Sequence, residues 1–204
     1  ELGLTDRRVI VYLGALGGCY LTDEMARFLA IAHRRDRSTF AMILTQSPPA
    51  LISKVLRRLG IGEGDYFVRQ IAPTEIPRYL LAADLALCFI KPSYSKAASS
   101  PTKVAEYLAS GLPIVCNAGI GDLDGLIEGE GVGVLVREFG DAHFRRALDG
   151  AEALISDCQI SSRCRTAAAA HFDLESVGGE RYRGLYQRLS VGIPHRPVKL
   201  ELSS

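Results

Sequence analysis

Short runs of apolar residues recur along the chain, and they constrain its fold more than any other feature. Each run is continuous rather than alternating, as expected for a strand with both faces buried in a parallel sheet. The runs are Val9–Leu13, Thr39–Thr45, Tyr66–Gln70, Leu85–Ile90, Leu112–Asn117 and Val132–Val136. A parallel sheet needs a covering layer on each face, so the segments between the runs are expected to be helices.

Helical patterns do separate and follow these runs. They cover Thr22–Arg35, Pro49–Leu59, Thr74–Ala83, Pro101–Ser110, Asp122–Glu128 and Asp141–Ser156, with a C-terminal helical stretch from Ser161 to Leu189. Strand and helix alternate as far as Val136, which predicts an α/β fold: a doubly wound, Rossmann-like parallel sheet of about six strands with helices on both faces. The 204 residues, 48% of them hydrophobic, suffice for one large domain.

Charge and cysteine content limit the classes of partner. A net charge of +1 gives no overall attraction to nucleic acid, so none is expected as a partner. Local basic clusters, such as Arg34, Arg35 and Arg37, are interpreted as solvated helix faces, with contact to an anionic membrane surface as the alternative. The 5 cysteines lack Cys-x-x-Cys spacing, which supports neither a zinc site nor a disulfide framework and favours the reducing cytosol. No apolar run is long enough to span a bilayer.

The first loop of the predicted sheet, Gly14–Tyr20, is a candidate ligand site. In doubly wound sheets ligands bind outside the carboxyl ends of the strands, near the point where strand order reverses. Glycines let the backbone approach a ligand closely, and backbone N–H groups there can face a diphosphate. The Gly-x-Gly-x-x-Gly fingerprint of dinucleotide-binding folds is absent, and so is a Walker A sequence. A tight turn without a ligand remains the alternative.

The segment Lys91–Val115 is the most informative stretch of the chain. Ser100 is predicted to cap a helix that has Pro101 at its first position. Gly111, followed by Pro113, is predicted to end it.

At about 100° per residue, this helix is predicted to carry four polar residues on one side: Thr102, Lys103, Glu106 and Ser110. A carboxylate there suits the neutral hydroxyls of a diol, whereas Lys103 and the amides of the helix N-terminus suit phosphates. A merely solvated polar face is the alternative interpretation.

The run Ser-Pro-Thr-Lys-Val-Ala-Glu-Tyr-Leu-Ala-Ser-Gly-Leu-Pro-Ile-Val, residues 100–115, resembles the donor-site segment of the retaining group 1 glycosyltransferases, which have the GT-B fold. Other segments of the chain resemble further parts of that family in the same order. They are Val9–Tyr20, Ala72–Asp84, Asn117–Ile127, Gly131–Val136 and Phe172–Tyr186.

The resemblance implies that residues 1–190 are the C-terminal, nucleotide-sugar-binding domain of such an enzyme. Residues 191–204 are then a tail, and the N-terminal acceptor-binding domain is missing from the chain. The implied activity is transfer of a hexosyl or related group from a nucleotide diphosphate sugar to a polysaccharide, lipid or other acceptor, with retention and without a metal or cofactor. The implied location is the cytoplasm or the membrane periphery, and the isolated chain is expected to be inactive by itself.

The resemblance also implies a set of donor-binding residues but assigns no catalytic one. Glu106 matches the glutamate that holds the nucleotide ribose, Gln70–Ala72 would lie by the base, and Ser99–Lys103 by the phosphates and sugar. The complete predicted set is Gly14, Leu16, Gly17, Gln70, Ile71, Ala72, Ser99, Ser100, Pro101, Thr102, Lys103 and Glu106.

Two departures from the family pattern affect the expected chemistry. Ala98 stands where the family carries a glutamate against the donor sugar. Ala15 and Tyr20 stand where an arginine and a lysine of the glycine-rich loop would neutralise the diphosphate. The lysines available to replace them are Lys91, Lys96 and Lys103. A non-catalytic nucleotide-sugar-binding or scaffold module, or a nucleotide-sugar epimerase of related fold, are therefore alternative functions.

Overall fold

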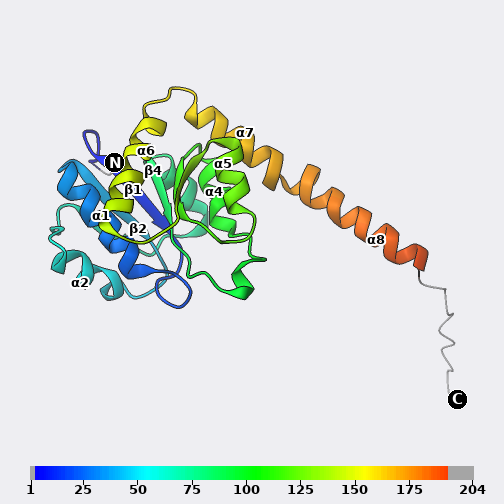
Figure 1. Ribbon diagram of the computed structural model, residues 1–204, viewed down its shortest axis with the longest axis horizontal. Helices are drawn as coiled ribbons and strands as arrows, with labels where there is room; N and C mark the ends of the chain where they lie inside the picture. The colour runs from blue at the N-terminus through cyan, green and yellow to red at the C-terminus, as the bar shows by residue number, and fades with distance from the viewer. Residues whose placement is uncertain (1–2, 193–204) are drawn as a thin grey trace, which may run out of the picture. The chain divides into compact units, whose positions relative to one another are not determined.

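The computed structural model describes residues 3–192 and contains one six-stranded sheet (Figure 1). Its strands are β1 (Arg8–Leu13), β2 (Thr39–Leu44), β3 (Tyr66–Arg69), β4 (Leu85–Cys88), β5 (Ile114–Asn117) and β6 (Gly133–Val136). All neighbouring strands are parallel, in the order β3-β2-β1-β4-β5-β6. The predicted doubly wound sheet is therefore confirmed, with the reversal of strand order between β1 and β4.

Helices cover both faces of the sheet. They are α1 (Thr22–Arg35), α2 (Ala50–Arg58), α3 (Ile76–Leu80), α4 (Thr102–Ala109), α5 (Leu123–Glu130), α6 (Asp141–Ile155), α7 (Ile160–Phe172) and α8 (Glu180–Gly192). Buried residues of α1, α2 and α6 form one hydrophobic cluster with alternate residues of the strands. Helices α4 and α5 lie on the other side of the sheet (Figure 1). Because the strands are buried on both faces, they appear in the sequence as continuous apolar runs.

Helix α3 is much shorter than the predicted Thr74–Ala83. Only Ile76–Leu80 is α-helical, and a 3₁₀ turn at Pro73–Glu75 (η1) precedes it. Pro73 and Pro77 have no backbone N–H, so a continuous helical ladder cannot form across them. A second 3₁₀ turn, Tyr94–Lys96 (η2), lies within the loop between β4 and α4.

The chain divides into two compact units, residues 1–168 and 169–204. In the second unit a π-helical turn, Leu174–Gly179 (η3), interrupts the helical stretch predicted from Ser161 to Leu189. The Asp173 side chain accepts hydrogen bonds from the backbone N–H groups of Glu175 and Ser176, which stabilises this turn. Of the predicted tail 191–204, residues 193–204 lie outside the described residues.

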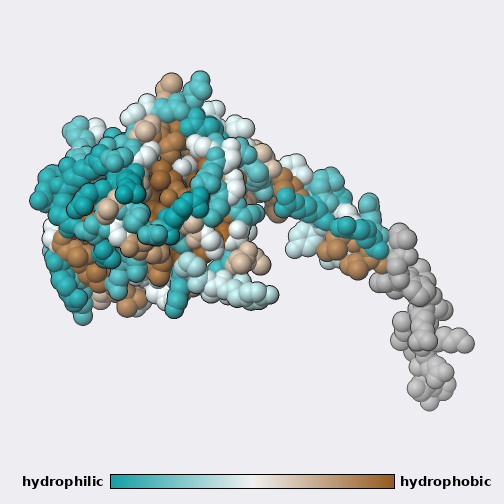
Figure 2. Space-filling view, viewed as in Figure 1, coloured by the Kyte–Doolittle hydropathy of each residue, from teal (hydrophilic) through white to brown (hydrophobic). Residues whose placement is uncertain are grey.

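Helix α8 carries exposed apolar side chains, and Figure 2 shows apolar surface along it. These residues recur at helical spacing and are Tyr182, Leu185, Tyr186 and Leu189. Among residues 3–192, no helix is both long and apolar enough to cross a membrane.

Candidate functional site

Loops that follow β1, β2, β3 and β4 meet at one edge of the sheet, because these strands are adjacent and parallel. The predicted residues Gln70–Ala72 follow β3, and Gln70 donates a hydrogen bond to the Gln46 carbonyl over 3.2 Å. Gln46 in turn donates to the Ile71 carbonyl over 3.1 Å. The loop after β2 thus joins the site through Gln46, which follows a strand as ligand-binding loops do but is not among the predicted donor-binding residues.

The glycine-rich loop after β1 adopts conformations that suit glycine, with φ of 134° at Gly14 and 76° at Gly17. Three of its backbone N–H groups, however, already have partners within the protein. Gly14 donates to the Leu44 carbonyl over 2.9 Å. Leu16 donates to the Ser47 hydroxyl over 2.9 Å, and Gly17 to the Thr22 hydroxyl over 2.8 Å. These three amides are not free to bind an anion while those bonds hold.

The end of β4 fixes the other side of this loop. The Lys91 N–H donates to the Cys19 carbonyl over 2.7 Å. The buried Asn117 side chain accepts from the Ile90 N–H over 2.7 Å and donates to the Ile90 carbonyl over 2.9 Å. Residues 89–91 are therefore held from both sides after the β4 ladder has ended.

The segment before α4 rests on the loop that follows β5. The Gly121 N–H donates to the Lys96 carbonyl over 2.9 Å. Gly121 has a φ of 53°, and a Cβ built there would overlap the Ser99 carbonyl oxygen. The absence of a side chain at Gly121 lets Ser99 lie half-buried, whereas Ala98 and Ser100 are exposed.

Helix α4 begins one residue later than predicted. Its N-cap is Pro101, with φ −68° and ψ 115°, and no side chain caps the helix. Ser100 is therefore not the N-cap, because the extended backbone of Pro101 delays the first helical residue to Thr102. Within the first turn the Val104 N–H donates to the Pro101 carbonyl over 2.9 Å, and the N–H groups of Thr102 and Lys103 precede it at this uncapped end, which favours an anion.

Lys103 was predicted to share one side of α4 with Thr102 and Glu106; those two residues are exposed, whereas Lys103 is only 6% exposed. Its ammonium donates a hydrogen bond to the Tyr12 hydroxyl over 3.2 Å. It also lies 3.7 Å from the centroid of the Tyr20 ring and 4.5 Å from that of Tyr12. A Cβ built on Gly14 would lie 2.5 Å from the Lys103 Nζ, so the bare Cα of Gly14 leaves the room that the ammonium occupies.

Burial lowers the pKa of Lys103 to about 8, from an ordinary value of 10.5. In the described part of the chain no carboxylate lies within ion-pair distance of its Nζ. Burial raises the pKa of Glu106, and the nearby Lys103 charge lowers it, so these two groups interact without touching. The ring faces of Tyr12 and Tyr20 offset part of the free-energy cost of burying this cation.

The other groups on α4 are divided between solvent and core. Thr102 and Glu106 are exposed, and the Ser110 hydroxyl donates to the Glu106 carbonyl over 2.8 Å within the helix. The fully buried Tyr107 accepts a hydrogen bond from the Leu13 N–H over 2.6 Å. Tyr107 thereby fixes α4 to the end of β1, a contact that sequence spacing did not predict.

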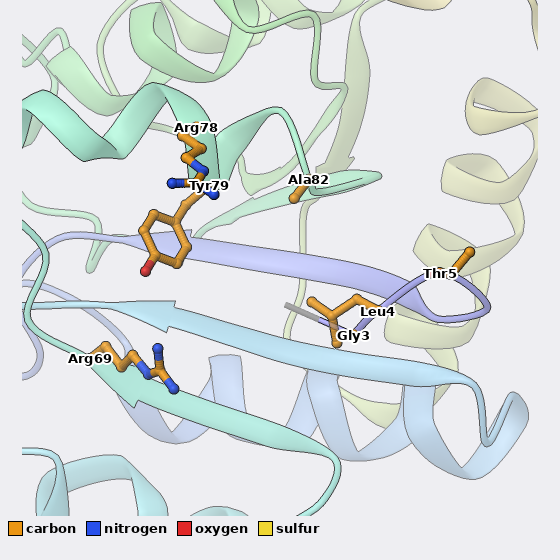
Figure 3. Close-up of a pocket in the computed structure, with 7 residues that line it drawn as sticks. All are labelled: Gly3, Leu4, Thr5, Arg69, Arg78, Tyr79 and Ala82. Atoms are coloured by element: carbon orange, nitrogen blue, oxygen red, sulfur yellow. The ribbon is translucent and has the colours of Figure 1, made fainter. Parts of the chain in front are cut away.

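Of two hollows in the surface, one is lined by a single predicted site residue, Gly17, and the other by none. One of about 290 Å³ beside Gly17 is lined with Asp23 and Glu24, whose carboxylates disfavour an anion there. A groove of about 700 Å³ lies between residues 3–5 and the side chains of Arg69, Arg78 and Tyr79 (Figure 3). Because that groove reaches the first described residue, and none of the predicted site residues lines it, we assign no ligand to it.

We expect Lys103→Met to stabilise the protein at pH 6.5. The folded-state pKa of Lys103 lies below its unfolded value, so folding disfavours the charged form below pH 8. Removing the charge should raise the free energy of unfolding by roughly 1–3 kcal/mol, after allowance for the lost aromatic contacts.

Urea denaturation at pH 6.5 and 9.5 measures this effect. The advantage of Lys103→Met should shrink as pH rises through 8, because the folded wild type then sheds its buried charge while the unfolded chain keeps its proton. The exposed Lys54→Met is the matched control and should show no such trend. A Lys103→Met protein less stable than wild type at pH 6.5 would contradict the prediction.

Comparison with known proteins supports the fold. No protein-family model matches the sequence, and no curated protein matches it. Among solved structures, the chain is similar to sucrose-phosphate synthase from Thermosynechococcus elongatus, with a TM-score of 0.73 and 16% identity over 92% of this chain and 47% of that chain. It is also similar to Anabaena HepE in complex with UDP-glucose, with a TM-score of 0.71 and 18% identity over 91% of this chain and 50% of that one.

A third similar structure is the C-terminal domain of a group 1 family glycosyl transferase, LpcC, from Francisella tularensis. The TM-score is 0.64 at 17% identity, over 82% of this chain and 87% of that chain. The chain spans about half the length of the sucrose-phosphate synthase and HepE chains. At these identities the similarity establishes that the chain has the α/β fold found in GT-B glycosyltransferases.

Proposed function

We propose that this chain is the donor-binding half of a glycosyltransferase that uses a nucleotide diphosphate sugar. The observation that carries the proposal is the convergence of Gly14–Gly17, Gln70–Ala72 and the N-terminus of α4 at one edge of the sheet, around the reversal of strand order. Doubly wound sheets bind their ligands at this place. One similar structure, HepE, is described as a complex with UDP-glucose.

In this proposal each group has a role that suits its chemistry. The exposed Glu106 carboxylate accepts hydrogen bonds from the ribose hydroxyls. The uncapped N-terminus of α4 and Lys103 face the phosphates, and Ser99 and Ser100 lie beside the sugar. Gln70–Ala72 lie by the base. Positive charge comes from helix amides and an ammonium, so we expect neither a metal nor a cofactor.

The finer features of the activity are proposed from the family resemblance. They are transfer of a hexosyl or related group with retention, to a polysaccharide, lipid or other acceptor. An N-terminal domain of the same protein would supply the acceptor site, in the cytoplasm or at the membrane periphery. A second candidate, a non-catalytic nucleotide-sugar-binding module, is favoured by Ala98, which offers no acceptor to a sugar hydroxyl, and by the occupied amides of Leu16 and Gly17.

Replacing Glu106 with alanine should weaken nucleotide binding at least tenfold. Loss of a charged hydrogen bond costs roughly 1.5–3 kcal/mol. Calorimetry with UDP, GDP and ADP on wild type selects the nucleotide, and the same titration on Glu106→Ala measures the loss. Glu63→Ala, which changes the net charge equally at the opposite edge of the sheet, is the control. Equal affinities for wild type and Glu106→Ala would remove Glu106 from the site.

The second prediction concerns Ala98. A methyl group accepts no hydrogen bond, so the sugar gains little from this position. The free nucleoside diphosphate should therefore bind nearly as tightly as the corresponding nucleotide sugar in parallel titrations. A nucleotide sugar that binds a hundredfold more tightly than its own nucleotide would show that other groups hold the sugar.

The third prediction is that the 204-residue chain alone does not transfer sugar. Transfer requires an oriented acceptor and exclusion of water, and orientation can contribute roughly 7–11 kcal/mol to lowering the barrier. A turnover assay with several nucleotide sugars and a broad acceptor panel measures this. Steady transfer by the chain alone, at rates typical of glycosyltransferases, would favour a self-contained enzyme of another class.

A further inference from the structure

Lys103 is a buried cation with no anionic partner in the described residues. Buried charges in proteins are normally paired or bound to a ligand, because desolvation of a lone charge is unfavourable. The Lys103 ammonium nevertheless lies at the end of β1, within the edge where the candidate site residues converge. Its missing counter-charge is therefore the feature of this edge that most directly indicates a ligand.

Tyr12, Tyr20 and Gly14 enclose this ammonium in what we call the tyrosine box. The two rings meet edge to face, with centroids 6.3 Å apart and an interplanar angle of 72°. The Tyr12 hydroxyl accepts from Lys103 and donates to the Ala15 carbonyl, so the ammonium is tied to the backbone of the glycine-rich loop. Aromatic faces attract a cation without neutralising it, which a carboxylate would do.

The groups that face Lys103 from other elements are also uncharged at neutral pH. They are the thiol of Cys88 on β4 and the hydroxyls of Tyr12 and Tyr20. The Cys19 side chain of the loop also lies near Lys103, and Glu106, on α4 itself, is the acid that affects it. Burial raises the pKa of Cys88 to about 11, so that thiol stays protonated. The positive charge of Lys103 thus has no directly bonded counter-charge in the described residues and is available to a ligand.

The glycine-rich loop itself offers few groups that could bind an anion. Its Leu16 and Gly17 amides are occupied by Ser47 and Thr22, and the hollow beside Gly17 is acidic. The positive groups that remain around Gly14 are the uncapped end of α4 and the Lys103 ammonium. An anion at this edge is therefore recognised from the α4 side.

We propose that Tyr12 and Tyr20 are positioning residues that hold the Lys103 ammonium against Gly14, so that the site selects nucleoside diphosphates over monophosphates through this one buried charge. The proposal rests on the proposed function, because it specifies how the donor's diphosphate is recognised. In this proposal the cation that binds the diphosphate comes from α4 and not from the glycine-rich loop. Tyr12 and Tyr20 hold that cation in place without neutralising its charge.

Calorimetric titrations with UDP and UMP, and with the GDP/GMP and ADP/AMP pairs, test the proposal on the full chain. Lys103→Met should lower diphosphate affinity about tenfold or more while changing monophosphate affinity much less. Tyr20→Leu removes the ring and should lower the diphosphate preference several-fold, whereas Tyr20→Phe keeps the ring and should retain it. Lys54→Met, an exposed lysine on α2, should behave as wild type.

A pH series on the wild type gives a second readout that requires no variant. The ratio of diphosphate to monophosphate affinity should fall about tenfold between pH 7.5 and 9.5, as the ammonium loses its proton; the phosphate groups are already ionised there, and titration of the base affects both nucleotides alike. The fall should be absent in Lys103→Met. In Tyr20→Leu it should begin at lower pH, because the unsupported cation deprotonates more readily.

The outcomes separate this inference from the proposed function. If wild type binds no nucleoside diphosphate of the panel, both fail. If wild type binds one but Lys103→Met keeps the same ratio of diphosphate to monophosphate affinity, the proposed function stands and the role of Lys103 is overturned. If Tyr20→Leu keeps both that ratio and the wild-type pH profile, the tyrosines do not position the ammonium.

Discussion

Two parallel strands, β1 and β4, pair where the strand order of the sheet reverses, and this pairing fixes the relative place of the glycine-rich loop and of the segment that leads to α4. Its register aligns Ile10 with Leu85 and Val11 with Ala86. The segments that follow β1 and β4 stay together beyond the ladder, because the Lys91 N–H donates to the Cys19 carbonyl and the Leu21 N–H donates to the Phe89 carbonyl. The Asn117 side chain at the end of β5 holds Ile90 from the other side. The glycine-rich loop and the segment leading to α4 therefore start from fixed positions.

The sequence predicted the sheet well because burial on both faces leaves a simple pattern. Six continuous apolar runs became six parallel strands, and Thr22–Arg35 is the observed extent of α1. The prediction failed where backbone chemistry overrides side-chain periodicity. The two prolines of the segment Pro73–Pro77 shortened α3, and the extended backbone of Pro101 displaced the cap of α4.

The candidate site was predictable in its location but not in its hydrogen bonding. Loops after parallel strands converge by topology, so Gly14 and Gln70 could be placed at one edge from the strand order alone. The occupied amides of Leu16 and Gly17 depend on Ser47 and Thr22, hydroxyls whose direction no local pattern reports. A helical projection likewise gives the direction in which Lys103 leaves α4, but not the four-carbon reach that brings its ammonium to Tyr12. Burial of that ammonium without a counter-charge is expected to reduce stability in the free protein, an arrangement typical of groups organised in advance for a ligand.

The contact between Gly14 and Lys103 also determines which of the two positions can vary. A side chain at position 14 meets two independent obstacles, the Lys103 ammonium and a backbone φ of 134°. A shorter residue at position 103 removes the first obstacle and leaves the second. A single substitution can therefore discard the buried charge, yet no change at position 103 frees Gly14 to become another residue. Gly14, which has no side chain, is therefore harder to replace than Lys103.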